Sequence, residues 1–168
     1  MAFLRSISFF VVVAITLSVA NGAKIKKVRT PKEVAAPVVI PAGFVKLAHK
    51  VSSGEITIKD SRTISIKSFS YDGAGPDAYF WVGKGTPTDS AAIVKGRKIA
   101  DENGSYDVIQ GYDKTDIELI LPADITFNDI DYLSVYCVSF HHLFGYVKIP
   151  KNLNVPEYSE DVVVATTS

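Results

Sequence analysis

A single cysteine, Cys137, carries the most reactive side chain in this sequence of 168 residues. Alternation along the apolar run 133–140 places Cys137 on the same strand face as Leu133 and Val135. The opposite face carries Tyr132, Tyr136, Val138 and Phe140. Because both faces are apolar, we expect a central strand. A buried cysteine acts as a small apolar side chain. An unpaired thiol in an oxidising compartment instead reacts, binds a ligand or pairs between molecules. Both interpretations stay open.

Histidines are the side chains best suited to support such a thiol. Nucleophilic or redox chemistry needs a thiolate held by a positive neighbour or a hydrogen bond. His141 follows Cys137 by four residues and can supply one if the strand turns after Phe140. His141 and His142 are adjacent, so on a strand they point to opposite faces and cannot both bind one ion. We expect one to be exposed and the other to be a hydrogen-bonded rim residue; His49 is the remaining histidine.

Several other chemistries are excluded. Gly83-Lys84-Gly85 precedes Thr86-Pro87 rather than a helix start, so it is not a nucleotide-binding loop. The sequence has no G-x-S-x-G elbow and no H-E-x-x-H motif. The acidic stretch 128–131 lacks the spacing of a calcium loop, and we predict no metal site. One cysteine rules out an internal disulfide or a multi-cysteine zinc site.

The charge balance argues against nucleic acid as a partner. Lys plus Arg and Asp plus Glu both number 18, whereas a nucleic-acid binder usually has an excess of basic residues.

Asn103-Gly104-Ser105 is an N-glycosylation sequon in a predicted turn, so Asn103 is a candidate glycan acceptor.

The first 22 residues have the form of a secretory signal peptide. Arg5 precedes an apolar run, and small residues follow up to a cleavage position before Ala23. The run is too short to span a bilayer, and no later stretch is long enough. We therefore expect a secreted, extracellular protein with no transmembrane segment after cleavage.

Three further segments follow. Residues 23–46 are basic and contain prolines, which predicts an extended linker. This linker is either a solvated tail or a tether for an acidic surface or matrix polymer. Residues 47–150 form the predicted β domain, and 151–168 an acidic irregular tail.

The β domain is expected to be an antiparallel sandwich or barrel-like domain of about eight short strands. Segments 55–59 and 63–67 alternate and pair as a hairpin, and a change of parity after Ser68 indicates a bulge or strand end. We predict a turn at 102–105 and one helical turn within 125–130. Further strands are expected at 78–82, 92–94, 98–100, 106–109, 116–121, 132–140 and 144–149. Segment 72–77 is a loop in which Gly73 and Gly75 are expected to have conformations disfavoured for other residues.

Two long motifs carry a family resemblance. The segment 69–81, Phe-Ser-Tyr-Asp-Gly-Ala-Gly-Pro-Asp-Ala-Tyr-Phe-Trp, resembles the opening signature of the DM-thirteen domain found in Skeletor proteins of animals. The segment 129–137 resembles its closing signature, and 144–147 and 49–57 resemble neighbouring parts. The similarity covers nearly all of the core in the right order and spacing. Tyr132 and Tyr136 stand where family members often carry Trp, and the chain looks like a single-domain secreted member.

The resemblance implies a function for Cys137, because the family's cysteine falls on this position. It implies electron transfer, with Cys137 acting as a bare thiol or holding a prosthetic group such as haem. Cys137 is thus the candidate catalytic residue, and Cys137 with His141 the candidate cofactor-binding pair. The cofactor itself stays unknown. We expect a redox module that needs a redox partner and is not a stand-alone enzyme.

The alternative is a non-catalytic domain that binds extracellular matrix or a cell-surface protein. In it, the loop 72–77 and the basic linker make the contacts. Tyr79 and Trp81 share one face of their strand. Their exposure would favour binding, whereas a pocket beside Cys137 lined by them would favour redox chemistry.

Overall fold

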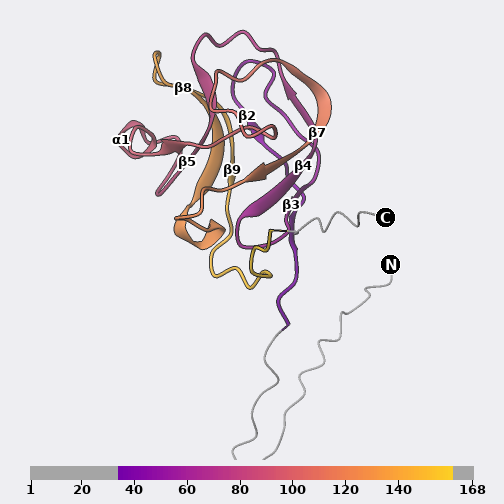
Figure 1. Cartoon of the computed structure of the whole chain (residues 1–168). Coiled ribbons are helices and arrows are strands. Elements are labelled where there is room, and N and C mark those ends of the chain that lie inside the picture. Colours follow the sequence, from indigo (N-terminus) through magenta and orange to yellow (C-terminus); the bar gives the residue numbers. More distant parts are fainter. Residues whose placement is uncertain (1–33, 161–168) are drawn as a thin grey trace, which may run out of the picture. The chain divides into compact units, whose positions relative to one another are not determined.

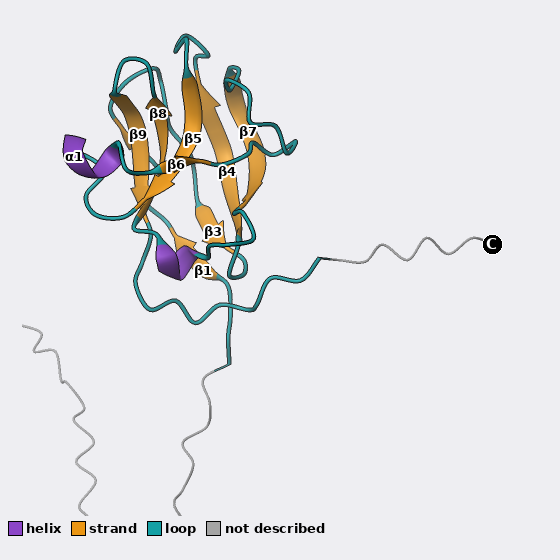
Figure 2. Ribbon diagram, turned by 60° about the vertical axis from the view of Figure 1, so that its left-hand side comes forward, coloured by secondary structure: helices purple, strands orange, loops and turns teal. Residues whose placement is uncertain are grey.

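The computed structural model describes residues 34–160, which contain two antiparallel sheets (Figures 1 and 2). The four-stranded sheet has the order β1 (Val38–Ile40), β3 (Ile56–Ile58), β4 (Thr63–Tyr71), β7 (Tyr112–Ile120). The five-stranded sheet has the order β2 (Val45–Lys46), β9 (His142–Lys148), β8 (Tyr132–Cys137), β5 (Ala78–Gly83), β6 (Arg97–Lys98). Two single-turn helices, α1 (Ser90–Ile93) and η1 (Phe127–Asp129), lie in the connections.

The two sheets share one apolar core. Alternating side chains of β3 and β4 point inward from one sheet, and those of β5, β8 and β9 from the other. The core members from these strands include Ile56, Ile58, Ile64, Ile66, Phe80, Val82, Leu133, Val135 and Val147. The expected antiparallel all-β sandwich is therefore confirmed.

The predicted hairpin and its bulge are both present. β3 pairs with β4 through Ile56↔Ile66 and Ile58↔Ile64. Asp60 closes the turn, because its carboxylate accepts hydrogen bonds from the backbone N–H groups of Arg62 (2.8 Å) and Thr63 (2.7 Å). The pairing of β4 with β7 shifts register after Ile66, where Ser68 has φ +50°. This β-bulge returns the next apolar side chain to the core.

Four expected strands differ from the structure. Segment 92–94 is wrong as a strand, because it overlaps the end of α1. The Asp89 carboxylate caps the start of this helix by accepting a hydrogen bond from Ala91 N (2.9 Å). Segment 106–109 forms no strand, and 98–100 contributes only the end of β6. β8 ends at Cys137 instead of residue 140, since 138–141 form a turn.

Both flanking segments contribute to the sandwich. β1 and β2 come from 23–46, where a linker is expected from the sequence, and both pair with other strands. Beyond residue 150, Leu153 packs against the core and Asn154 accepts a hydrogen bond from Ala36 N (3.2 Å). The predicted signal peptide, 1–22, lies outside the described residues. Within 34–160, no helix has the length and apolarity to cross a membrane.

The loop 72–77 uses its two glycines for different reasons. Gly73 has φ +70°, as expected. Gly75 has an ordinary φ, so the expectation of an unusual backbone is wrong there. Instead, a Cβ on Gly75 would lie 2.5 Å from Phe144 Cε2 and 2.6 Å from the Tyr71 hydroxyl. Gly75 is therefore required for close packing.

We predict that Gly75→Ala lowers the free energy of unfolding by about 1–3 kcal/mol, because the methyl group must displace Phe144 or Tyr71. Gly54→Ala is the matched control, since its Cβ would come no closer than 3.4 Å to any other atom. The control should be neutral or stabilising by up to about 1 kcal/mol. Denaturant unfolding measures both, and a Gly75→Ala midpoint equal to that of Gly54→Ala would contradict the packing explanation.

Candidate functional site

Cys137 is the last residue of β8 and is 1% exposed. It pairs with Ala78 of β5 on one side and His142 of β9 on the other. Its side chain belongs to the inner core with Leu133 and Val135. Tyr132 and Tyr136 form a separate outer cluster with Ile93. The predicted division of faces is thus confirmed for 132–137, whereas Phe140 lies in the turn after the strand and is 68% exposed, so its expected burial is wrong.

Tyr71 and the loop 72–77 close the core near Cys137. The Tyr71 hydroxyl accepts a hydrogen bond from Gly75 N (2.8 Å), which fixes the loop over the ring. Tyr71 also stacks on Phe144 at 6.1 Å between ring centroids. Burial raises the pKa of Tyr71, the Gly75 bond partly offsets this, and negative charge at Asp72 or Cys137 raises it further. The phenol therefore stays protonated at neutral pH.

Two histidines flank Phe144 at this end of the sandwich. The His49 ring lies 4.0 Å from the Phe144 ring and 6.4 Å from that of His142. His142 meets Phe144 edge to face at 5.2 Å. We call His49, His142 and Phe144 the histidine rim. It joins residues from distant parts of the sequence at the strand pair that holds Cys137.

Asp72 orients His49 within this rim. The Asp72 carboxylate lies 3.2 Å from His49 Nδ1 and accepts a hydrogen bond from Ala74 N (3.0 Å). These contacts lower the pKa of Asp72, the Ala74 bond most strongly. The carboxylate is therefore ionised at neutral pH and available to hold a protonated imidazole.

His141 is not brought to Cys137. Its Nδ1 atom shares a hydrogen bond with the Tyr136 hydroxyl at 3.1 Å, and Tyr136 lies on the other face of β8. The residue opposite Cys137 in register is His142. Cross-strand partners have Cβ atoms roughly 4.5–5.5 Å apart on the same face. His142 thus occupies the position that the sequence suggested for His141, and His141 is the hydrogen-bonded one of the pair.

Asp77 holds the turn that follows Cys137. Its carboxylate accepts hydrogen bonds from Ser139 N (2.9 Å) and from the Ser139 hydroxyl, and its carbonyl accepts one from Val138 N (3.0 Å). The bonds from Ser139, and then one from Tyr79, lower the pKa of Asp77. We call Asp77 and Ser139 the turn clamp, because they tie the β8–β9 turn to the start of β5.

Tyr79 and Trp81 are half-buried on the outer face of β5. The Lys98 ammonium lies 3.9 Å from the Tyr79 ring centroid. Trp81 packs on Tyr136 at 5.4 Å, and its indole N–H donates to Ile93 O (2.9 Å). Both rings belong to the packing of the sheet itself, so neither forms the open patch that would favour a binding domain.

The packing around Cys137 does not fit a haem. A haem on Cys137 needs an open volume beside the sulfur, whereas the cysteine is 1% exposed. At Gly75, Phe144 and Tyr71 leave no room even for a methyl group. Within residues 34–160, no group of three or more His, Cys, Asp or Glu side chains is placed to hold a metal ion. The thiol itself is the chemistry that this site offers.

Asn103 lies in an exposed turn, as expected. Its backbone N–H donates to the Asp101 carboxylate (2.9 Å), and Gly104 follows with φ +79°. The amide of Asn103 is accessible, and its glycosylation stays a prediction.

Comparison with known proteins gives one consistent result. A family model described as Electron transfer DM13 matches residues 43–149. Protein Skeletor of Drosophila melanogaster, in isoforms B/C and in isoforms D/E, is 45% identical over 109 residues, or 64% of this chain. The matched part is 13% and 7% of those proteins, so the chain corresponds to a small fraction of their length. No solved structure matches. The match confirms the resemblance carried by segments 69–81 and 129–137.

We predict that Asp77→Ala opens the turn clamp and makes Cys137 react several-fold faster with a maleimide. The bonds from Ser139 that hold the turn are lost, while Cys137 itself is unchanged. Asp113→Ala removes the same charge from an exposed position on β7 and serves as control. Equal labelling rates for the two variants would show that the clamp does not protect the thiol.

The turn clamp should also depend on pH in one direction. Because folding lowers the pKa of Asp77, its stabilising contribution is present above the unfolded pKa of about 4. It is lost as the pH falls through the lower folded value. The melting temperature of the wild type should therefore exceed that of Asp77→Ala at neutral pH, and the difference should vanish in strong acid. A difference that persists there would contradict this assignment.

Proposed function

The chain belongs to the Electron transfer DM13 family, and from this premise we propose that it carries electrons at Cys137 as part of an exported protein. One observation carries the proposal: the single cysteine lies buried at the end of a central strand, directly opposite a histidine. The signal-like segment 1–22 and the sequon at Asn103 support export.

The proposed step is a one-electron oxidation. The Cys137 thiol gives one electron to a metal-centre acceptor on a partner protein, and its proton passes to the His142 imidazole. The product is a thiyl radical beside an imidazolium. A reductant then returns one electron, the proton comes back from His142, and the thiol is restored. Atoms and charge balance in both directions, and no group is transferred.

Burial of the sulfur suits electron transfer better than covalent exchange. Thiol–disulfide exchange requires a second sulfur to reach Cys137 along a direct line of attack. With the thiol 1% exposed beneath Tyr71 and the loop 72–77, such an approach is blocked. An electron needs only a short path through packed atoms. β8 and β9 pair Cys137 with His142, which is exposed, so the proposed route for the electron leads across this strand pair.

The histidine rim supplies the proton acceptor and a way to stabilise its charge. His142 lies on the same face as Cys137, and the His49 ring follows at 6.4 Å. Asp72, ionised at neutral pH, is bonded to His49. A proton that reaches the histidine rim is therefore stabilised by the ionised Asp72 carboxylate. Because the thiol loses its proton together with its electron, no charged sulfur radical is left in the apolar core.

We predict that native protein reduces an outer-sphere one-electron oxidant, hexachloroiridate(IV), at a rate set by Cys137. Cys137→Ser should slow the reaction at least about tenfold. His142→Gln should slow it several-fold by removing the proton acceptor. His141→Gln is the matched control, because it changes the adjacent histidine on the other face and should leave the rate unchanged. Stopped-flow absorbance follows the oxidant.

Two outcomes would contradict the proposal. If Cys137→Ser reacted as fast as the wild type while keeping its melting temperature, the electrons would come from elsewhere. The non-catalytic binding domain would then be the better interpretation. If His141→Gln and His142→Gln had equal effects, the role of the register partner of Cys137 would be wrong. Circular dichroism of each variant checks that the fold is intact.

A further inference from the structure

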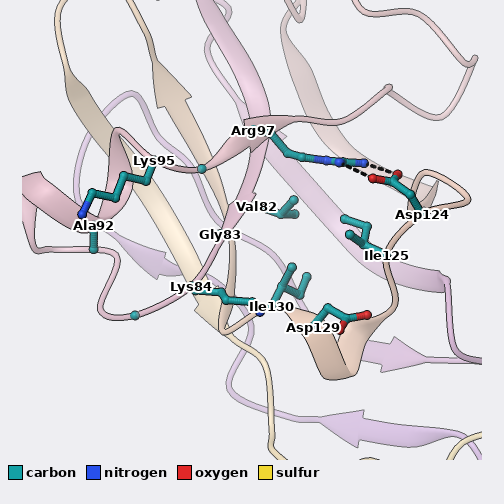
Figure 3. Close-up of a pocket in the computed structure, with 12 residues that line it drawn as sticks. Val82, Gly83, Lys84, Ala92, Lys95, Arg97, Asp124, Ile125, Asp129 and Ile130 are labelled. Carbon is teal, nitrogen blue, oxygen red and sulfur yellow. Dashed lines mark hydrogen bonds and ion pairs between the residues drawn. The ribbon is translucent and has the colours of Figure 1, made fainter.

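A cleft of about 660 Å³ opens at the end of β5, and its lining comes from β5, α1, β6 and η1 (Figure 3). Val82 and Gly83 line it at the last residues of β5, whereas Ala78, the partner of Cys137, is the first. The cleft and Cys137 therefore lie at opposite ends of the same strand. We propose that this cleft binds a small organic anion with an apolar body, of the arylalkyl carboxylate class. This site goes beyond the proposed electron transfer and does not depend on it.

The centre of the cleft is apolar. Figure 3 shows the side chains of Val82, Ile125 and Ile130 gathered there, with Ala92 on the α1 side. The cleft lies within the size range of small-molecule sites. Aliphatic side chains around the centre offer a surface for the apolar part of a ligand.

The charged side chains of the cleft leave an excess of positive charge. Lys84, Lys95 and Arg97 face two carboxylates. Arg97 holds Asp124 through two bonds of 2.6 and 2.7 Å. Asp129 already accepts hydrogen bonds from Thr126 N (2.9 Å) and Thr126 Oγ1 (2.8 Å).

Lys84 and Lys95 carry the positive charge that remains in the cleft, although the charge of Lys84 also lowers the pKa of Asp129. Within residues 34–160, neither Lys84 nor Lys95 enters an ion pair. In Figure 3 the end of the Lys84 side chain lies beside Ile130, whereas Lys95 leans toward Ala92. A carboxylate on Lys84 would therefore place its apolar body over the centre of the cleft. Charge favours an anion there over a cation or a neutral molecule.

An unpaired hydroxyl under the cleft lining gives a second, independent indication. Tyr132 is fully buried, and its hydroxyl has no hydrogen-bond partner within residues 34–160. A Cβ on Gly83 would collide with this hydroxyl, so the hydroxyl packs against a glycine that lines the cleft. Burial raises the pKa of Tyr132 to about 12, which keeps it a donor. A buried donor without an acceptor is costly, and this one lies behind the Gly83 backbone that lines the cleft.

Ligand binding in the cleft can be measured by intrinsic fluorescence, because Trp81 is the chain's single tryptophan. Its indole nitrogen lies directly behind Gly96 in the cleft lining. We predict that 3-phenylpropionate changes Trp81 fluorescence in a saturable way and shifts the amide resonances of Gly83, Gly85 and Gly96. The neutral isostere 3-phenylpropanamide should bind roughly fivefold or more weakly. Added salt should weaken the binding of 3-phenylpropionate and leave the binding of 3-phenylpropanamide unchanged.

Variants locate the site. Lys84→Gln should reduce the affinity for 3-phenylpropionate roughly fivefold or more, and Ala92→Leu should reduce it by filling the cleft. Lys46→Gln, on β2 at the opposite edge of the same sheet, removes an equal charge and should have no effect. The proposal is overturned if the wild type shows no saturable change, if the amide binds as well as the acid, or if Lys84→Gln and Lys46→Gln behave alike. Cys137→Ser should bind normally, which separates this result from any failure of electron transfer.

Discussion

Every side chain of β8 is buried, because this strand lies between β5 and β9 and is covered on both faces. This burial on both faces fixes the surroundings of Cys137 and of the two tyrosines of β8. Inward alternation puts Cys137 in the shared core, and outward alternation puts Tyr132 and Tyr136 under α1 and Trp81. A one-residue slip of β8 would exchange the two faces and expose or misplace all six side chains.

Each end of β8 holds a different buried polar group, a thiol at one end and a hydroxyl at the other. At its last residue, the thiol is enclosed by Tyr71 and the loop 72–77, with the histidine rim beside it. At its first residue, Tyr132 keeps an unpaired hydroxyl behind Gly83. Glycines make both ends possible, since Gly75 and Gly83 each stand where any side chain would collide with a tyrosine hydroxyl. Close packing thus removes solvent from both chemical groups.

The features predicted correctly from the sequence depend on local residue patterns, whereas the features that were missed depend on how the strands pair. Alternation was enough for the hairpin at 55–67, for the bulge after Ser68 and for the face of Cys137. It could not choose between His141 and His142, because that choice follows from a four-residue turn and its pairing. β1 and β2 were missed because short strands in a proline-containing segment gain their stability only from the sheet edges they join. The Asp89 cap was the signal that could have identified α1.

The central claim is that the Cys137 sulfur carries the electron. It is tested most directly by oxidising the native protein with a one-electron oxidant, freezing the sample within milliseconds and recording its electron paramagnetic resonance spectrum in the presence of a spin trap. Mass spectrometry then locates the trapped radical. The predicted result is a sulfur-centred adduct on Cys137 that disappears in Cys137→Ser. An adduct only on tyrosine or tryptophan, with Cys137 unmodified, would contradict the claim.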